Sequence, residues 1–178
     1  MTHKLTTEEM HRMTLEEFRE SEKLPLTVAL DNVRSLNNIG SVFRTSDAFR
    51  VEHIALCGIT ATPPHREIHK TALGAEDSVS WSYYEDAREC LHELKARGYK
   101  IYAVEQVDDS IKLGISKFEI QNSKLAIVLG NEIEGVQESL LPLCDGCLEI
   151  PQYGTKHSLN VSCAAAIAIW EISKQLRK

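Results

Sequence analysis

Residues 155–172 read TKHSLNVSCAAAIAIWEI, a short polar loop followed by a long uncharged run. Two candidate capping residues, Ser158 and Asn160, stand at the end of that loop. Their side-chain oxygens can accept hydrogen bonds from the unpaired N–H groups of a first helical turn. The same N–H groups favour acceptors and anions, so the start of a helix can also hold a ligand. We therefore expect a helix over 160–176 with a binding loop before it.

Short apolar runs and helical patterns alternate along the rest of the chain. The runs predict strands at 26–30, 53–58, 100–105, 124–130 and 147–150, with a weaker strand pattern at 78–84. Helical patterns predict helices at 38–49, 65–73, 85–98 and 137–144. Strands that alternate with helices indicate an α/β fold, here a mostly parallel sheet flanked by helices.

The N-terminal stretch 6–21 is charged and amphipathic. It contains two Thr-x-x-Glu sequences with the spacing of a capping box, so it is predicted as one helix or as two short ones. We expect the chain to consist of an N-terminal helical extension over 1–24 and one α/β domain over 25–178.

Length and composition limit the class of protein. A chain of 178 residues is large enough to bury a core as one domain, and its net charge of −6 excludes a uniformly basic surface. Any contact with nucleic acid must therefore be local. The N-terminus MTHKLTTEEM lacks the apolar core of a signal peptide, and no apolar run approaches a membrane span. Five scattered cysteines fit reduced thiols in a cytoplasmic protein better than a disulfide framework.

Ligands of parallel α/β sheets bind outside the carboxyl ends of the strands, which directs attention to the loops that follow them. The first loop leads into a helix on which Ile39, Val42 and Phe43 form one face and Arg44 the opposite face. The plain interpretation is a surface helix with a solvated arginine. The functional interpretation places Arg44 at the ligand-binding edge with Asn38 beside it.

Two later loops are rich in acceptors. Asn131 and Glu132 follow the predicted strand at 124–130, and Glu132 can accept hydrogen bonds from a ligand or from a neighbouring loop. The glycines around them are typical of turns, and the pattern is neither a dinucleotide fingerprint nor a P-loop. The loop at 150–160 places donors and acceptors at the predicted start of the last helix.

Taken in this order, the three loops resemble the motifs of the SpoU/TrmH-type SPOUT RNA methyltransferases. The first motif, Asn followed six residues later by Arg, matches NIGSVFR at 38–44. The second matches LGNEIEGV at 129–136, and the third matches IPQYGTKHSLNVSCAAAIAIWE at 150–171. The resemblance spans 26–175, nearly the whole chain.

The resemblance implies a C-terminal trefoil knot, a rare exception to unknotted topology, with S-adenosylmethionine bound in it. The implied reaction is methyl transfer to a ribose 2′-hydroxyl of tRNA or rRNA. No metal is required, because the methyl donor is already a sulfonium. The resemblance also implies a homodimer whose active site lies near the subunit interface, with RNA as the substrate and no membrane.

Residue roles follow from the motifs. The resemblance implies catalytic roles for Arg44, Asn38, Glu132, Ser158 and Asn160. It implies cofactor binding by Glu105, Leu129, Gly130, Asn131, Gly135, Ile150, Ser158 and Leu159. Arg44 is expected to be essential; its guanidinium has no acceptor and suits an alkoxide or phosphate contact, while a proton role stays open. Asn38 and Ser158 would orient Arg44 or the ribose. Glu132 and Asn160 would brace the knot loops and the subunit contact.

Other patterns are weaker. Cys144 and Cys147 have metal or redox spacing, but without a second pair they are most simply structural thiols. HREIH at 65–69 is not a zinc-binding H-E-x-x-H helix, and it is more simply a solvated helix or a local phosphate contact. The alternative function is a non-catalytic RNA-binding protein on the same knotted fold, which could dispense with Arg44 and the cofactor loop. A nucleotide-binding enzyme of another class would need a phosphate-cradling glycine motif.

Overall fold

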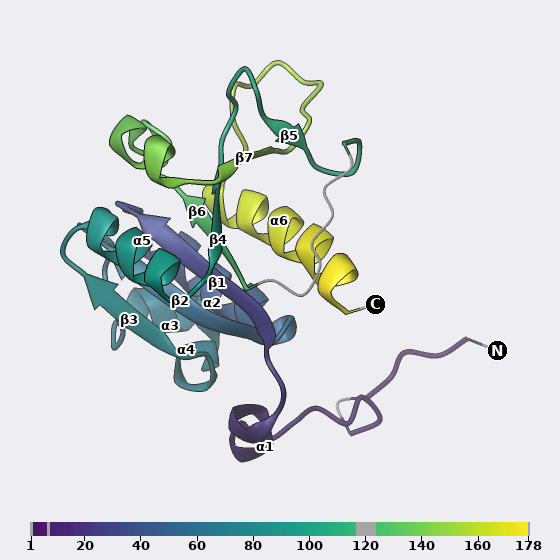
Figure 1. The fold of residues 1–178 in the computed structure, drawn as a ribbon. Helices are drawn as coiled ribbons and strands as arrows, with labels where there is room; N and C mark the ends of the chain where they lie inside the picture. The colour runs from purple at the N-terminus through teal and green to yellow at the C-terminus, as the bar shows by residue number, and fades with distance from the viewer. Residues whose placement is uncertain (1, 7, 117–123, 178) are drawn as a thin grey trace.

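A seven-stranded sheet runs through the protein, and its strands pair in parallel (Figure 1). The computed structural model describes residues 2–6, 8–116 and 124–177. The strands are β1 Leu24–Asp31, β2 Val51–Cys57, β3 Trp81–Tyr84, β4 Lys100–Val104, β5 Ile111–Lys112, β6 Leu125–Leu129 and β7 Gly146–Glu149, in the spatial order β3-β2-β1-β6-β4-β7-β5. The predicted parallel α/β fold is confirmed.

Helices cover both faces of the sheet. They are α1 Leu15–Glu20, α2 Leu36–Ala48, α3 Arg66–Ala72, α4 Ala75–Ser78, α5 Ala87–Ala96, the 3-10 helix η1 Glu138–Leu143 and α6 Val161–Leu176. In β1, Val28 and Leu30 enter the core shared with α2, α3 and α6, whereas Ala29 enters the core shared with α5 and η1. This alternation follows from the pleat of a strand that is buried on both faces.

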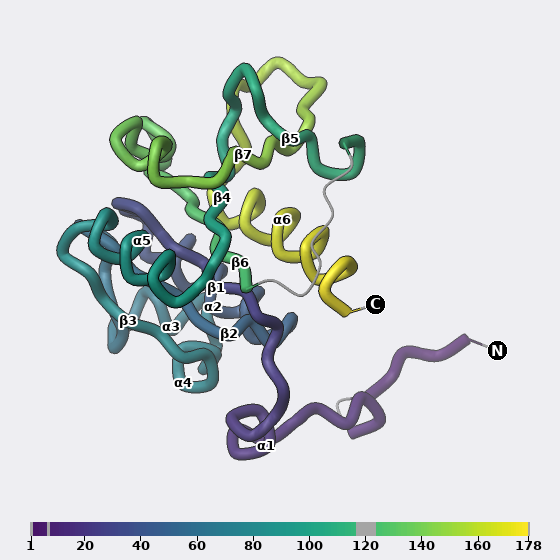
Figure 2. The backbone as a smooth tube through the Cα atoms, in the orientation of Figure 1, coloured from purple at the N-terminus to yellow at the C-terminus, as the bar shows by residue number. Residues whose placement is uncertain are grey.

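The last helix, α6, returns to the middle of the sheet and packs against α2 and β1 (Figure 2). Asn160 caps it: Oδ1 accepts from the N–H groups of Ser162 (2.9 Å) and Cys163 (3.4 Å). Ala165 and Ala168 are fully buried, and their small side chains allow the helix to approach its neighbours closely. The predicted helix is thus confirmed, while the trefoil knot around it stays a prediction.

Three elements differ from the sequence-based expectation. Among the described residues of the stretch 6–21, only those of α1 are helical, so neither one long helix nor a second short one is found there. The first Thr-x-x-Glu sequence makes both capping-box hydrogen bonds between Thr6 and Glu9, but a turn follows in which His11 takes a φ of 45°. The start of the weak strand pattern at 78–84 lies at the end of α4, and the two-residue β5 had no detectable pattern.

A buried hydroxyl on α2 leads to a first prediction. Among the described residues, Ser46 alone has a buried side-chain oxygen without a hydrogen-bond partner. Because an unsatisfied buried hydroxyl costs free energy, Ser46→Ala is expected to raise the free energy of unfolding by about 1 kcal/mol in urea titrations. Ser41→Ala is the matched control: its Oγ donates to the Asn37 carbonyl (2.9 Å), so its loss should not stabilise. A lower urea midpoint for Ser46→Ala would contradict this.

The described part of the chain shows neither a long apolar helix nor a metal cluster. None of its helices is long and apolar enough to cross a membrane. Its His, Cys, Asp and Glu side chains form no group of three or more that could hold a metal ion.

Candidate active site and cofactor cavity

A cavity of about 590 Å³ opens at the carboxyl ends of β4, β6 and β7, beside the amino end of α6. Its lining includes every residue predicted to bind the cofactor: Glu105, Leu129, Gly130, Asn131, Gly135, Ile150, Ser158 and Leu159. Glu132 and Asn160, two of the predicted catalytic residues, line it as well. Its volume lies in the range of small-molecule sites, and its position follows the rule for parallel sheets.

One chain of hydrogen bonds joins the three sequence motifs at this edge. The Glu132 carboxylate accepts from the side-chain amide of Asn38 (3.1 Å). The side-chain oxygen of Asn38, Oδ1, in turn accepts from Nδ2 of Asn160 (3.1 Å). The side-chain oxygen of Asn160 caps α6. The loop after β6, the start of α2 and the start of α6 are therefore held in a fixed relation by three side chains.

Glu132 also holds the loop that precedes α2. Its two carboxylate oxygens accept from the backbone N–H groups of Arg34 (3.0 Å) and Ser35 (3.0 Å). Burial alone would raise the pKa of Glu132, but these backbone hydrogen bonds and the Asn38 amide hold it below its ordinary value. Glu132 is therefore ionised at neutral pH and acts as a brace between two loops.

The lowered pKa of Glu132 gives a prediction with a definite sign. Glu132→Gln is expected to lower the free energy of unfolding at pH 7 by about 1 kcal/mol, allowing for solvent screening of this exposed side chain. The stabilisation by the carboxylate is fully present above the unfolded pKa and is lost as the pH falls through the lower folded pKa. Urea titrations should therefore show the two proteins converging in stability below a pH of about 4. A difference that is constant from pH 7 to pH 3 would contradict this.

Gly130 and Gly135 are required by the tight packing of the loop after β6. A Cβ atom at Gly130 would overlap the backbone of Gly135 and Val136. Gly135 has a φ of 71°, and a Cβ there would overlap the Glu105 carboxylate, which accepts from the Val136 N–H (3.1 Å). The close approach at Gly130 is thus made by the chain's own backbone.

Asn131 shapes the same loop from within. Its Nδ2 donates to the Asn32 carbonyl (2.8 Å), and its Oδ1 accepts from the N–H of Ile133 (2.9 Å) and of Glu134 (3.3 Å). Its backbone N–H and carbonyl both bond to Gly135. The polar groups of Asn131 are already used, so we expect it to act on a ligand through the shape of the loop.

The loop before α6 leaves the hydroxyl of Ser158 open. Gln106 donates to the carbonyl of His157 (2.7 Å) and so fixes the loop against the end of β4. Ser158 is exposed, and within the described residues its hydroxyl has no hydrogen-bond partner. Ser158 is therefore free to contact a ligand or a substrate.

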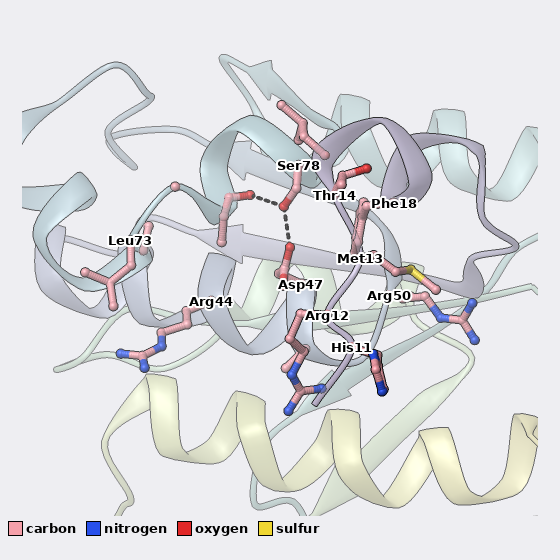
Figure 3. A pocket seen from close by; sticks show the side chains of 15 residues that line it. His11, Arg12, Met13, Thr14, Phe18, Arg44, Asp47, Arg50, Leu73 and Ser78 are labelled. Carbon is pink, nitrogen blue, oxygen red and sulfur yellow. Dashed lines mark hydrogen bonds between the residues drawn. The ribbon is translucent and has the colours of Figure 1, made fainter. Parts of the chain in front are cut away.

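Arg44 lies apart from this cavity. It is exposed on α2, and its side chain makes no hydrogen bond or ion pair with any other residue that the structure describes. It lines a second cavity, which is enclosed by the N-terminal segment and by residues 72–78 (Figure 3). Asn38 contacts Glu132 and Asn160, and the structure does not bring it to Arg44.

The sequence analysis missed one residue of structural importance, Asp31. It is fully buried at the end of β1, and its carboxylate accepts from the backbone N–H (3.1 Å) and the side-chain amide (2.7 Å) of Gln137. It thereby fixes the end of the loop after β6. The sequence offered one signal for this residue: an acidic side chain directly follows the apolar run at 26–30.

The weaker candidates have structural roles. Burial raises the pKa of Cys144 to about 11, and its thiol donates to the Leu140 carbonyl (3.4 Å), so it is an unreactive thiol. His65 caps α3 by accepting from the Glu67 N–H (3.1 Å), and His69 bonds to Glu76 (2.5 Å). These contacts agree with a structural thiol at Cys144 and with a solvated helix at 65–69.

Comparison with known proteins gives a consistent result. The model of the SpoU rRNA Methylase family matches residues 25–170. A Thermus thermophilus protein named tRNA (guanosine(18)-2′-O)-methyltransferase is 33% identical over 171 residues, covering 96% of this chain and 85% of its own length. The structure of the A. aeolicus TrmH/SpoU tRNA modifying enzyme has a TM-score of 0.78 at 27% identity, over 90% of this chain and 80% of that one. The AdoMet-bound rRNA methyltransferase from Sinorhizobium meliloti shares the fold, with a TM-score of 0.78 at 24% identity, over 88% of this chain and 59% of that one.

Proposed function

The chain belongs to the SpoU rRNA methylase family, and we propose that it transfers a methyl group from S-adenosylmethionine to a ribose 2′-hydroxyl of tRNA or rRNA. The main support for this proposal is that hydrogen bonds join the three sequence motifs at one edge of the sheet. The Glu132–Asn38–Asn160 hydrogen bonds fix that edge beside a cavity lined by all the predicted cofactor residues.

The cavity fits S-adenosylmethionine in size and in chemistry. Its volume of about 590 Å³ lies in the range that small-molecule sites show. Ile150 and the partly exposed Leu159 offer apolar surface to an adenine, and the carboxylates of Glu105 and Glu132 favour a cation. When bound there, the cofactor supplies an electrophilic methyl group on a sulfonium.

The chain's own residues would position and activate the hydroxyl. Ser158, exposed at the rim of the cavity, can hydrogen bond to the ribose or to the cofactor. Asn38 and Asn160 hold the two helix starts that border the site. Arg44 cannot accept a proton, because a guanidinium has no free lone pair, but it can stabilise a developing alkoxide or bind the adjacent phosphate.

We also propose a homodimer in which Arg44 of one subunit serves the cavity of the other. In the described chain Arg44 lies at a different cavity from Ser158, so one subunit alone does not bring them together. The helix α6 leaves Ile167 and Trp170 exposed at 41% and 54%, an apolar face that a second copy could cover. Trp170 packs edge-to-face on Phe49 (5.8 Å between ring centroids), which fixes its position.

The dimer leads to a testable expectation. The wild-type protein should sediment as a dimer at micromolar concentration, and Trp170→Glu should sediment as a monomer of about half that mass. The control Ile115→Glu, at a residue that is exposed at 65% after β5, should remain a dimer. A wild-type protein that sediments only as a monomer of 20.0 kDa would exclude the shared site.

Methyl transfer is tested with RNA from a strain that lacks this protein. Tritiated methyl incorporation from S-adenosylmethionine into tRNA and rRNA is expected, with the product mapped as a 2′-O-methyl nucleotide. The Thermus relative, by its name, acts on guanosine 18 of tRNA, so that nucleotide is the first to examine. The alternative, a non-catalytic RNA-binding protein, would show RNA binding without incorporation; the presence of Arg44 and of a complete cavity favours the enzyme.

Three finer features belong to this proposal. The chain divides into an N-terminal extension over 1–24 and a methyltransferase domain over 25–178; β1 begins at Leu24, the last residue of this extension. The backbone around α6 forms the trefoil knot. The protein acts in the cytoplasm, where its proposed RNA substrates are found.

A further inference from the structure

A second cavity, of about 610 Å³, lies between the N-terminal segment and α2 (Figure 3). The segment 11–15 and Phe18 form one wall of it, α2 and Arg50 form another, and residues 72–78 complete it. The methyltransferase domain and the N-terminal extension therefore build this cavity together. The role inferred for this cavity rests on the proposed function, because Arg44 is one of the lining residues.

The charge of this cavity is strongly positive. Arg12, Arg44 and Arg50 line it, together with His11. Within the described residues none of the three arginines forms an ion pair, and Arg12 donates only to the sulfur of Met10 (3.8 Å). In a chain whose net charge is −6, three such arginines around one cavity indicate an anionic ligand.

The acid in the described part of the lining forms no ion pair with these arginines. Asp47 is the single acidic residue among the described lining residues, and its carboxylate accepts a hydrogen bond from the Ser78 hydroxyl. In Figure 3 the Asp47 carboxylate points toward Ser78, whereas Arg44, Arg12 and Arg50 are spread across the view with their guanidinium groups turned away from it. The arginines therefore keep their donors available for a ligand.

Most of the remaining lining is apolar. Met13 and Leu73 are exposed at 50% and 62%, and the buried Phe18 lines the cavity as well. A cavity that combines several guanidinium groups with apolar side chains suits a phosphate that carries a flat, partly apolar base. A nucleotide of RNA has both parts, whereas a free anion would not use the apolar surface.

We propose that this cavity binds the phosphate and base of an RNA nucleotide that neighbours the methylated ribose, with Arg12 and Arg50 as phosphate contacts. Arg44 is shared between this cavity and the reaction, so the bound nucleotide must be close to the methylated one. The N-terminal extension then acts in RNA binding through Arg12.

Methylation kinetics and RNA binding test this on the full-length protein. The variants are Arg12→Gln, Arg50→Gln and the double variant, because glutamine keeps most of the side-chain stem while removing the charge. The control is Arg88→Gln, which removes an equal charge from an arginine paired with Asp86 (2.6 Å) on α5, across the sheet from the cavity. The probes are bulk tRNA and rRNA from a strain that lacks the protein, and S-adenosylmethionine alone.

Each single variant is expected to raise the KM for RNA by about tenfold and the double variant by about a hundredfold, with kcat within twofold of wild type. Filter binding of the same RNA should weaken in parallel. The slope of log affinity against log salt concentration should become shallower by about 0.7–0.9 for each arginine removed. The affinity for S-adenosylmethionine, measured by calorimetry, should be unchanged in all four variants.

Two results would overturn the inference. One is a double variant whose RNA affinity equals that of Arg88→Gln, and the other is weaker binding with an unchanged salt slope. If wild type binds RNA but methylates none, the proposed function fails while filter binding still decides the role of the cavity. If wild type binds neither tRNA nor rRNA, both proposals fail.

Discussion

Arg44→Ala is expected to reduce methyl transfer to RNA by about 10²-fold or more, as when a donor to transition-state charge is deleted. The variant should still fold, because Arg44 is exposed while Ile39, Val42 and Phe43 form the buried face of α2. It should also bind S-adenosylmethionine with wild-type affinity, because Arg44 does not line the cofactor cavity.

Tritiated-methyl incorporation into tRNA or rRNA measures the loss, and calorimetry measures cofactor binding. Arg44→Lys should restore activity only in part, because a lysine is a point charge without the planar, forked donors of a guanidinium. Arg88→Ala serves as the control, since that arginine is on α5 and paired with Asp86. Wild-type incorporation by Arg44→Ala would show that the first motif has been assigned wrongly.

Gly130→Val is expected to reduce the affinity for S-adenosylmethionine by at least about 10²-fold, which corresponds to about 3 kcal/mol. A Cβ atom at this position overlaps the backbone of Gly135 and Val136, so the loop after β6 must move. That loop forms one wall of the cofactor cavity and carries Glu132, so its displacement changes both the cavity and the hydrogen bonds to α2.

The control for this loop is Gly154→Ala. Gly154 is on the loop before α6, its φ is outside the left-handed region, and a Cβ there would meet no atom within 4 Å. It should bind S-adenosylmethionine like wild type in the same calorimetric titration. Circular dichroism separates a local change in Gly130→Val from a failure to fold. A folded Gly130→Val with unchanged affinity would place the cofactor elsewhere.

Much of the fold is predictable because the apolar pattern is regular. The helix predicted over 85–98 is α5, and its apolar residues Ala87, Cys90, Leu91 and Leu94 form its buried face. The short elements were not predictable. The two residues of β5 are too few to show the alternation of a strand, and α4 is a single helical turn after Gly74. The N-terminal stretch shows that a capping box by itself does not produce a helix.

The site was predictable as a set of residues but not as a set of contacts. Motif resemblance identified residues that do line one cavity. The hydrogen bonds between Glu132, Asn38 and Asn160 join positions that are far apart in the sequence, and no local pattern encodes such a contact. The separation of Arg44 from the cavity could not be read from a motif that contains Asn38 and Arg44 six residues apart.

The parallel sheet has a consequence for synthesis on the ribosome. β1 lies between β2 and β6, and its pairing with β6 joins Leu26 to Leu125, about a hundred residues later in the chain. While the chain is being made, β1 can pair with β2 early, but its other edge stays open until β6 has left the exit tunnel. An apolar strand with an open edge readily pairs with other chains, so nascent chains of this protein should depend on chaperones until the last third has emerged.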